Sequence, residues 1–126
     1  MIVISDTSPL SALAEIGELS LLPRLYGSVV VPETVRKECL HPRAPVDLSP
    51  WFSTSTWLQG VPDPQPLLPE VAGLDPGEAA AITLAWQFRD DALIIVDDLD
   101  GRKLCDALHL RRTGTAASST RQRGRD

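Results

Sequence analysis

The sequence predicts an α/β fold in which a mostly parallel central sheet carries helices on both faces. Short β-branched runs recur along the chain, at residues 2–4, 28–31 and 93–96. Runs this short and apolar are typical of buried parallel strands rather than of helices. Segments with helical signals separate them, and such alternation favours a parallel sheet with right-handed crossovers. The first and last of these runs end in carboxylates, at the sheet edge where open α/β folds place their sites.

The first run, Ile2-Val3-Ile4, leads to Asp6, and a helix is predicted directly after it. Ser8 is the expected N-cap and Pro9 the first helical residue, because proline's missing N–H costs nothing at that position. Asp6 therefore lies at the carboxyl end of a strand. It is either a capping or turn residue or part of a functional site.

The second unit repeats this order of elements. A short helix is predicted over residues 19–26 and ends at Gly27, and the strand at 28–31 then leads into a helix that runs from Pro32 to Leu40. Glu38 shares a helical face with Val35, so its carboxylate can point inward. The alternative is a glutamate that is simply solvated.

Prolines are dense between residues 41 and 75, which predicts a connecting segment without long elements. Residues 53–58 are expected to form a short strand at the sheet edge. Trp51, Phe52 and Trp57 either stack on the bases of a single-stranded nucleic acid or anchor this segment on the core. Anchoring is the more frequent use of such residues.

The clearest helix begins at Asp75, with Pro76 in its first position and Glu78 in its third. This is an aspartate version of the capping box, which alone explains Glu78, although a cap does not exclude a metal-binding role. The strand at 93–96 then ends in Asp97 and Asp98, and a further helix follows near residue 99. The alternative for these aspartates is a solvated, helix-capping turn.

Parallel topology brings the acidic positions toward one edge of the sheet. The predicted set is Asp6, Glu38, Glu78, Asp97 and Asp98. Oxygen ligands without cysteine or histidine describe a site for Mg²⁺ or Mn²⁺. The reaction that suits such a site is metal-assisted hydrolysis of a phosphodiester.

Composition limits the remaining possibilities. A chain of 126 residues with 43% hydrophobic residues fits one domain. Five of its twelve basic residues and one of its seventeen acidic residues lie in 111–126, so an acidic body precedes a basic tail. The lack of a membrane-length apolar run or a basic leader predicts a cytoplasmic protein. Cys39 and Cys105 are expected to be buried, reduced thiols.

Four motifs in order resemble those of PIN-domain nucleases, and most of all VapC-like ribonuclease toxins of prokaryotic toxin–antitoxin pairs. They are Ile4-Ser5-Asp6-Thr7-Ser8-Pro9-Leu10, Val31-Pro32-Glu33-Thr34-Val35 with Glu38, Leu74-Asp75-Pro76-Gly77-Glu78-Ala79, and Val96-Asp97-Asp98 with Gly101-Arg102.

The resemblance implies a PIN-like, three-layer fold over residues 1–115. Residues 116–126 depart from the family pattern, and their small, polar and basic composition predicts a disordered tail. The resemblance also implies a metal-dependent endoribonuclease with Asp6, Glu38, Glu78 and Asp98 as catalytic residues. With Asp97 they form the metal-binding set, in which Asp98 is a more direct ligand than Asp97. The implied partners are an RNA substrate, a cognate antitoxin and a second copy in a homodimer. The alternative is a non-catalytic PIN-fold module that binds a partner protein or RNA.

Overall fold

The computed structural model describes residues 1–116 and confirms the α/β prediction. All five strands pair in parallel in one sheet, in the order β3-β2-β1-β4-β5. The strands are β1 (Ile2–Ser5), β2 (Val29–Pro32), β3 (Leu58–Val61), β4 (Ala92–Ile95) and β5 (Arg111–Thr113).

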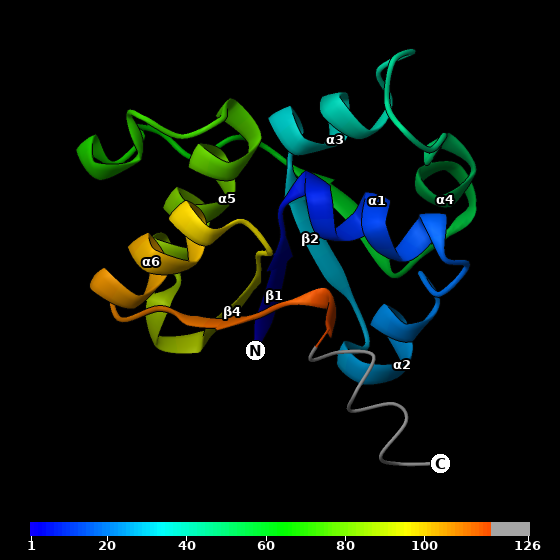
Figure 1. Ribbon diagram of the computed structural model, residues 1–126. Coiled ribbons are helices and arrows are strands. Elements are labelled where there is room, and N and C mark those ends of the chain that lie inside the picture. The colour runs from blue at the N-terminus through cyan, green and yellow to red at the C-terminus, as the bar shows by residue number, and fades with distance from the viewer. Residues whose placement is uncertain (117–126) are drawn as a thin grey trace.

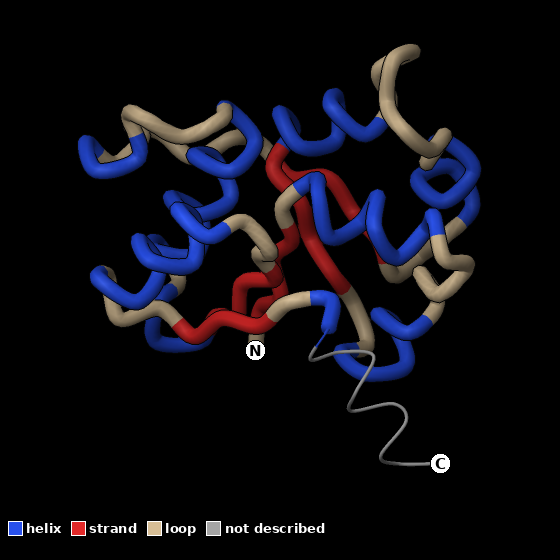
Figure 2. The backbone as a smooth tube through the Cα atoms, viewed as in Figure 1, coloured by secondary structure: helices blue, strands red, loops and turns tan. Residues whose placement is uncertain are grey.

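Helices cover both faces of this sheet. The chain moves from β1 toward β3 through one set of helices and then crosses back to β4 and β5 through another, and right-handed crossovers place the two sets on opposite faces. Figures 1 and 2 show the two sets flanking the strands. The helices are α1 (Thr7–Glu15), α2 (Leu21–Tyr26), α3 (Glu33–Cys39), α4 (Ser49–Thr54), α5 (Pro76–Gln87) and α6 (Leu99–Ala107), with 3₁₀ turns η1 (Pro69–Val71) and η2 (Arg89–Asp91).

The core lies where the central strands meet these helices. Ile4, Val31 and Ile94 are fully buried in β1, β2 and β4, as expected for apolar parallel strands. Helix α5 is buried along residues 77–85, because its small alanines allow it to approach the sheet closely. Both cysteines are buried and free, which confirms their prediction as apolar core residues.

The start of α1 differs from the prediction. The helix begins at Thr7, and its N-cap is Asp6 rather than Ser8, with the Asp6 Oδ1 atom accepting a 2.7 Å hydrogen bond from the Thr7 N–H. Asp6 is a good cap because its backbone is extended and its carboxylate is short. Pro9 still falls within the first turn, where its missing N–H is harmless.

The predicted strand at 53–58 is wrong in position. Helix α4 extends to Thr54, and the edge strand β3 begins only at Leu58. Pro50 lies in the first turn of α4, where proline favours a helix start. Trp51 and Trp57 meet edge to face and, together with Phe52, pack against the core, so anchoring describes these aromatics better than base stacking.

Strand β5 was not predicted, because Arg111 and Arg112 leave it without an apolar pattern. At a sheet edge these side chains remain in solvent, and only Thr113 is buried.

No helix among residues 1–116 is long and apolar enough to cross a membrane. Residues 117–126 of the predicted tail lie outside the part of the chain that the structure describes.

Candidate metal-binding active site

The carboxyl ends of β1 and β4 form the centre of the site. The chain leaves β1 toward β2 on one side and leaves β4 toward β5 on the other, so a crevice opens between these two strand ends. Ser5 pairs with Ile95, and the Asp6 N–H donates to the Ile95 carbonyl at 3.2 Å. Asp6 and the acidic residues after β4 are therefore held at the same point of the sheet.

A pocket of about 370 Å³ lies at this crevice, and we refer to it as the acidic pocket. Its lining residues are Asp6, Thr7, Ser8, Glu38, Asp75, Pro76, Glu78 and Asp98. Four of the five acidic residues predicted from the sequence are therefore brought together in one cavity.

Three helices begin at the acidic pocket. Asp6, Asp75 and Asp98 are the N-cap residues of α1, α5 and α6. The Asp98 Oδ2 atom accepts a 3.2 Å hydrogen bond from the Gly101 N–H, as a capping carboxylate does. The positive ends of three helix dipoles partly offset the mutual repulsion of the carboxylates.

Glu38 reaches the pocket from α3, which packs beside the first turn of α5. Its Oε1 atom accepts a 2.5 Å hydrogen bond from the Thr7 hydroxyl, and its Oε2 atom accepts one of 3.2 Å from the Gly77 N–H. Glu38 thereby caps α5 from a distance, whereas the Asp75 side chain makes no cap hydrogen bond. The solvated alternative for Glu38 is wrong, because its carboxylate is half-buried and anchored to two other helices.

Asp6 and Glu78 are buried acids, with exposed fractions of 5% and 6%. Loss of solvation raises the pKa of Asp6 to about 6, against the lowering effect of the Thr7 hydrogen bond. Burial likewise raises the pKa of Glu78 to about 7, and the charges of Asp6 and Asp98 raise it further. The pocket thus holds more negative charge than its surroundings compensate, which is the condition that a bound cation relieves.

The comparison with family models decides the family. A model described as a PIN domain matches residues 2–117, which is nearly the whole chain. The chain belongs to the PIN domain family. No curated protein and no solved structure matches it.

PIN domains are in general nucleases and typically use Mg²⁺ or Mn²⁺. The donors in this PIN domain's pocket fit such a cation chemically, since five acidic residues line it and two of them are held buried with raised pKa values. Within residues 1–116, however, no three acidic, histidine or cysteine side chains are grouped closely enough to form a ready-made metal site.

Asp97 lies differently from the rest of the predicted set. Its Oδ1 and Oδ2 atoms accept hydrogen bonds of 2.9 Å each from the N–H and the hydroxyl of Thr115. The carboxylate therefore holds the segment after β5 against the end of β4. Its predicted contribution to metal binding remains a prediction, and so do the catalytic roles of the pocket acids.

Sequence reasoning missed the part that glycines play in this PIN domain. A Cβ atom at Gly77 would overlap the Glu38 Oε1 atom, and one at Gly101 would lie 2.8 Å from the Glu78 Oε2 atom. Each glycine thus leaves space for one of the pocket carboxylates. The available signal was in the motifs themselves, where both glycines stand beside acidic residues.

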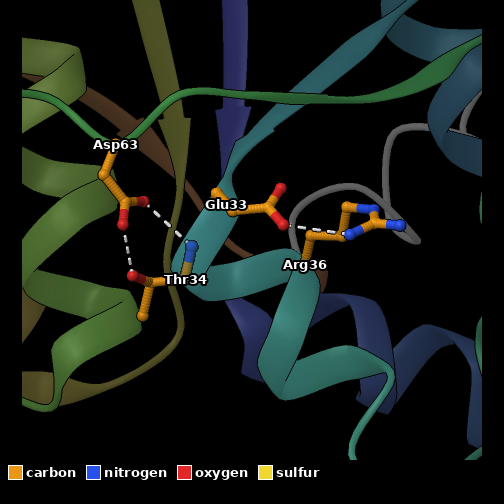
Figure 3. Close-up of polar contacts among 4 residues, drawn as sticks. All are labelled: Glu33, Thr34, Arg36 and Asp63. Atoms are coloured by element: carbon orange, nitrogen blue, oxygen red, sulfur yellow. Dashed lines mark hydrogen bonds and ion pairs between the residues drawn. The ribbon is translucent and has the colours of Figure 1, made fainter.

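Asp63 is a second residue that the sequence did not reveal. Figure 3 shows its carboxylate accepting hydrogen bonds from the backbone N–H and the hydroxyl of Thr34, at 2.9 and 2.6 Å. Asp63 lies after β3 and so caps α3 from outside that helix. Because Glu38 lies one turn beyond Thr34, this cap helps to fix its position over the pocket.

The glycine observation gives a prediction about stability. Gly101→Ala is expected to lower the free energy of unfolding by about 1–3 kcal/mol, because the new methyl group overlaps both Glu78 and Val96. Chemical denaturation measures this. Gly73→Ala is the matched control, since a Cβ there meets nothing within 4 Å. Equal stability of the two variants would show that Glu78 does not pack against Gly101.

Proposed function

We propose that this PIN domain is a metal-dependent endoribonuclease that hydrolyses RNA phosphodiester bonds with Mg²⁺ or Mn²⁺. The observation that carries the proposal is the acidic pocket, in which five carboxylates line one crevice at the carboxyl ends of β1 and β4. A purely structural cluster would gain nothing from keeping Asp6 and Glu78 buried with raised pKa values.

The proposed metal-holding residues are Asp6, Glu38, Glu78 and Asp98, with Asp97 beside them. A divalent cation in this pocket would supply charge neutralisation at the phosphate and a more acidic water. The chain's own contribution is placement. Thr7 and Gly77 fix the Glu38 carboxylate, and Gly101 fixes that of Asp98.

We further propose that the protein is the toxin of a prokaryotic toxin–antitoxin pair, with a cognate antitoxin protein and a homodimeric assembly as its partners. The order of the four motifs supports this, while the family match does not distinguish toxin ribonucleases from other PIN domains. Titrating the protein with the product of a neighbouring small gene would test the pairing, and sedimentation would test the dimer.

A non-catalytic module that binds a protein or RNA is the second candidate. It is favoured by one observation, namely that Asp6 and Asp98 already serve as helix caps, which is a structural use for both. Incubation of purified protein with single-stranded and structured RNA, with Mn²⁺ or with a chelator, separates the two. Cleavage that requires the metal supports the enzyme, and a folded protein that cleaves neither RNA supports the binding module.

Metal binding also has a signature in stability. Millimolar Mg²⁺ or Mn²⁺ is expected to raise the Tm by several degrees at neutral pH, because the cation binds only the native state and relieves repulsion there. Differential scanning fluorimetry at constant ionic strength measures the shift. An unchanged Tm in both metals would contradict a metal site in the acidic pocket.

A further inference from the structure

A second pocket shares Glu38 with the acidic one and includes two cationic residues in its lining. It measures about 400 Å³, and we refer to it as the basic pocket. It is lined by Thr34, Lys37, Glu38, His41, Arg43 and Ala44. Glu38 lines both pockets, so the two cavities meet at this side chain.

The cations of the basic pocket are available to a ligand. Ion pairs within residues 1–116 involve Arg36, Arg112 and the amino terminus, but neither Lys37 nor Arg43. Arg36 lies next to Lys37 in sequence, yet Glu33 holds its guanidinium at 3.0 Å (Figure 3). Among residues 1–116, Lys37 and Arg43 therefore line this cavity without an ion-pair partner.

The turn after α3 holds the His41 ring against the backbone of Arg43. The Arg43 N–H donates a 3.0 Å hydrogen bond to the Nδ1 atom of His41. When the imidazole is neutral, this leaves its Nε2–H as a further donor. Lysine, arginine and histidine around one cavity are typical of phosphate recognition.

Charge balance indicates why such a cavity would be needed. Only seven basic residues stand against sixteen acidic ones before residue 111, so the body of the protein repels a polyanion. An RNA strand that enters the acidic pocket must find compensating cations close by. Lys37 and Arg43 lie one side chain away from it, across Glu38.

We propose that the basic pocket binds a backbone phosphate of the RNA strand next to the phosphodiester that the acidic pocket would hold. This rests on the proposed function and adds the path of the substrate, which runs from the acidic pocket across Glu38 toward the end of α3. The cavity binds the backbone and not the base, so it favours no particular sequence.

The test is RNA binding without metal, so that cleavage plays no part. Fluorescence anisotropy of a short labelled single-stranded RNA, in chelator and over about 50–200 mM salt, gives the slope of log affinity against log salt. Removing both cations in Lys37→Gln/Arg43→Gln is expected to weaken this slope by about 0.7, the value for one lost phosphate contact on a single strand. With Mn²⁺ the same variant should show a raised KM for RNA cleavage.

Arg24→Gln/Arg111→Gln is the matched control. It removes the same charge from one residue that precedes β2 and one that begins β5, at the amino ends of the strands and away from both pockets. The control is expected to keep the slope and KM of the natural sequence. Equal losses in both double variants would overturn the proposal in favour of diffuse attraction, and so would RNA that fails to bind the natural sequence.

The two proposals fail in different ways. If the natural protein cleaves RNA but Lys37→Gln/Arg43→Gln keeps the natural salt slope and KM, the basic pocket is not a phosphate site. The proposal that the protein is a nuclease is then unaffected. If the slope weakens only in the pocket variant but no protein cleaves RNA, the phosphate site stands and the nuclease does not.

Discussion

Asp98→Asn is expected to lower metal-dependent RNA cleavage by orders of magnitude while the protein remains folded. Asparagine keeps an acceptor oxygen for the Gly101 N–H, and it is as good an N-cap as aspartate, so α6 should still begin at the same residue. What the substitution removes is one negative charge from the acidic pocket, and hard divalent cations are held by such charges. Cleavage rates in Mn²⁺, with circular dichroism of the same samples, measure both effects.

Asp6→Asn extends this test to a buried member of the pocket. Asparagine at this position can still accept the hydrogen bond from the Thr7 N–H. It carries no charge, so the burial that raises the pKa of Asp6 to about 6 no longer lowers stability. Stability in metal-free buffer at neutral pH should therefore rise, by at most about 3 kcal/mol, while cleavage is lost.

Asp90→Asn is the control for both variants. Asp90 is exposed in η2, which precedes β4 and so lies at the amino ends of the strands, away from the acidic pocket. This control should cleave like the natural sequence. Equal cleavage by all three variants would place the activity outside the acidic pocket or in a contaminant.

The fold was predictable because parallel strands carry a strong local signal. Val31 and Ile94 belong to short β-branched runs that are typical of buried strands, and the glycine and proline residues around them mark the helix boundaries. The edge strands were harder. Arg111 and Arg112 can face solvent there, so β5 needs no apolar pattern, and β3 was displaced by α4.

The candidate site was predictable in its members but not in its contacts. Residues that directly follow a parallel strand, or that lie at the start of a helix, are placed at the carboxyl edge of the sheet by the topology alone. Asp6, Glu78 and Asp98 come together for this reason. Contacts between distant segments leave no local pattern. Glu38 caps α5 although it lies 39 residues before Gly77 in the sequence. The sequence pattern identifies Asp75 only as the N-cap residue of α5, and the folded structure is needed to show that it also lines the acidic pocket.

Glu78→Gln is expected to change both the activity and the pH dependence of stability. Glu78 has a pKa of about 7 in the folded protein and an ordinary value of 4.5, so the native state binds more protons than the unfolded state between these values. The free energy of unfolding that this group contributes is fully present below pH 4.5 and is lost as the pH rises through 7. Glutamine keeps the shape and has no such proton, so the variant should gain stability relative to the natural sequence as the pH rises from about 5 to 8.

Urea denaturation across that pH range, without metal, measures the difference, and Mn²⁺-dependent RNA cleavage is followed on the same samples. Glu70→Gln is the control, since Glu70 is exposed in η1 and outside the acidic pocket. Because Glu78 would hold metal through its charge, the Glu78→Gln protein should cleave RNA orders of magnitude more slowly than the control. A variant that is less stable at every pH and still cleaves RNA would mean that Glu78 serves the start of α5 alone. A stability difference that does not depend on pH would mean that its carboxylate is not held at a raised pKa.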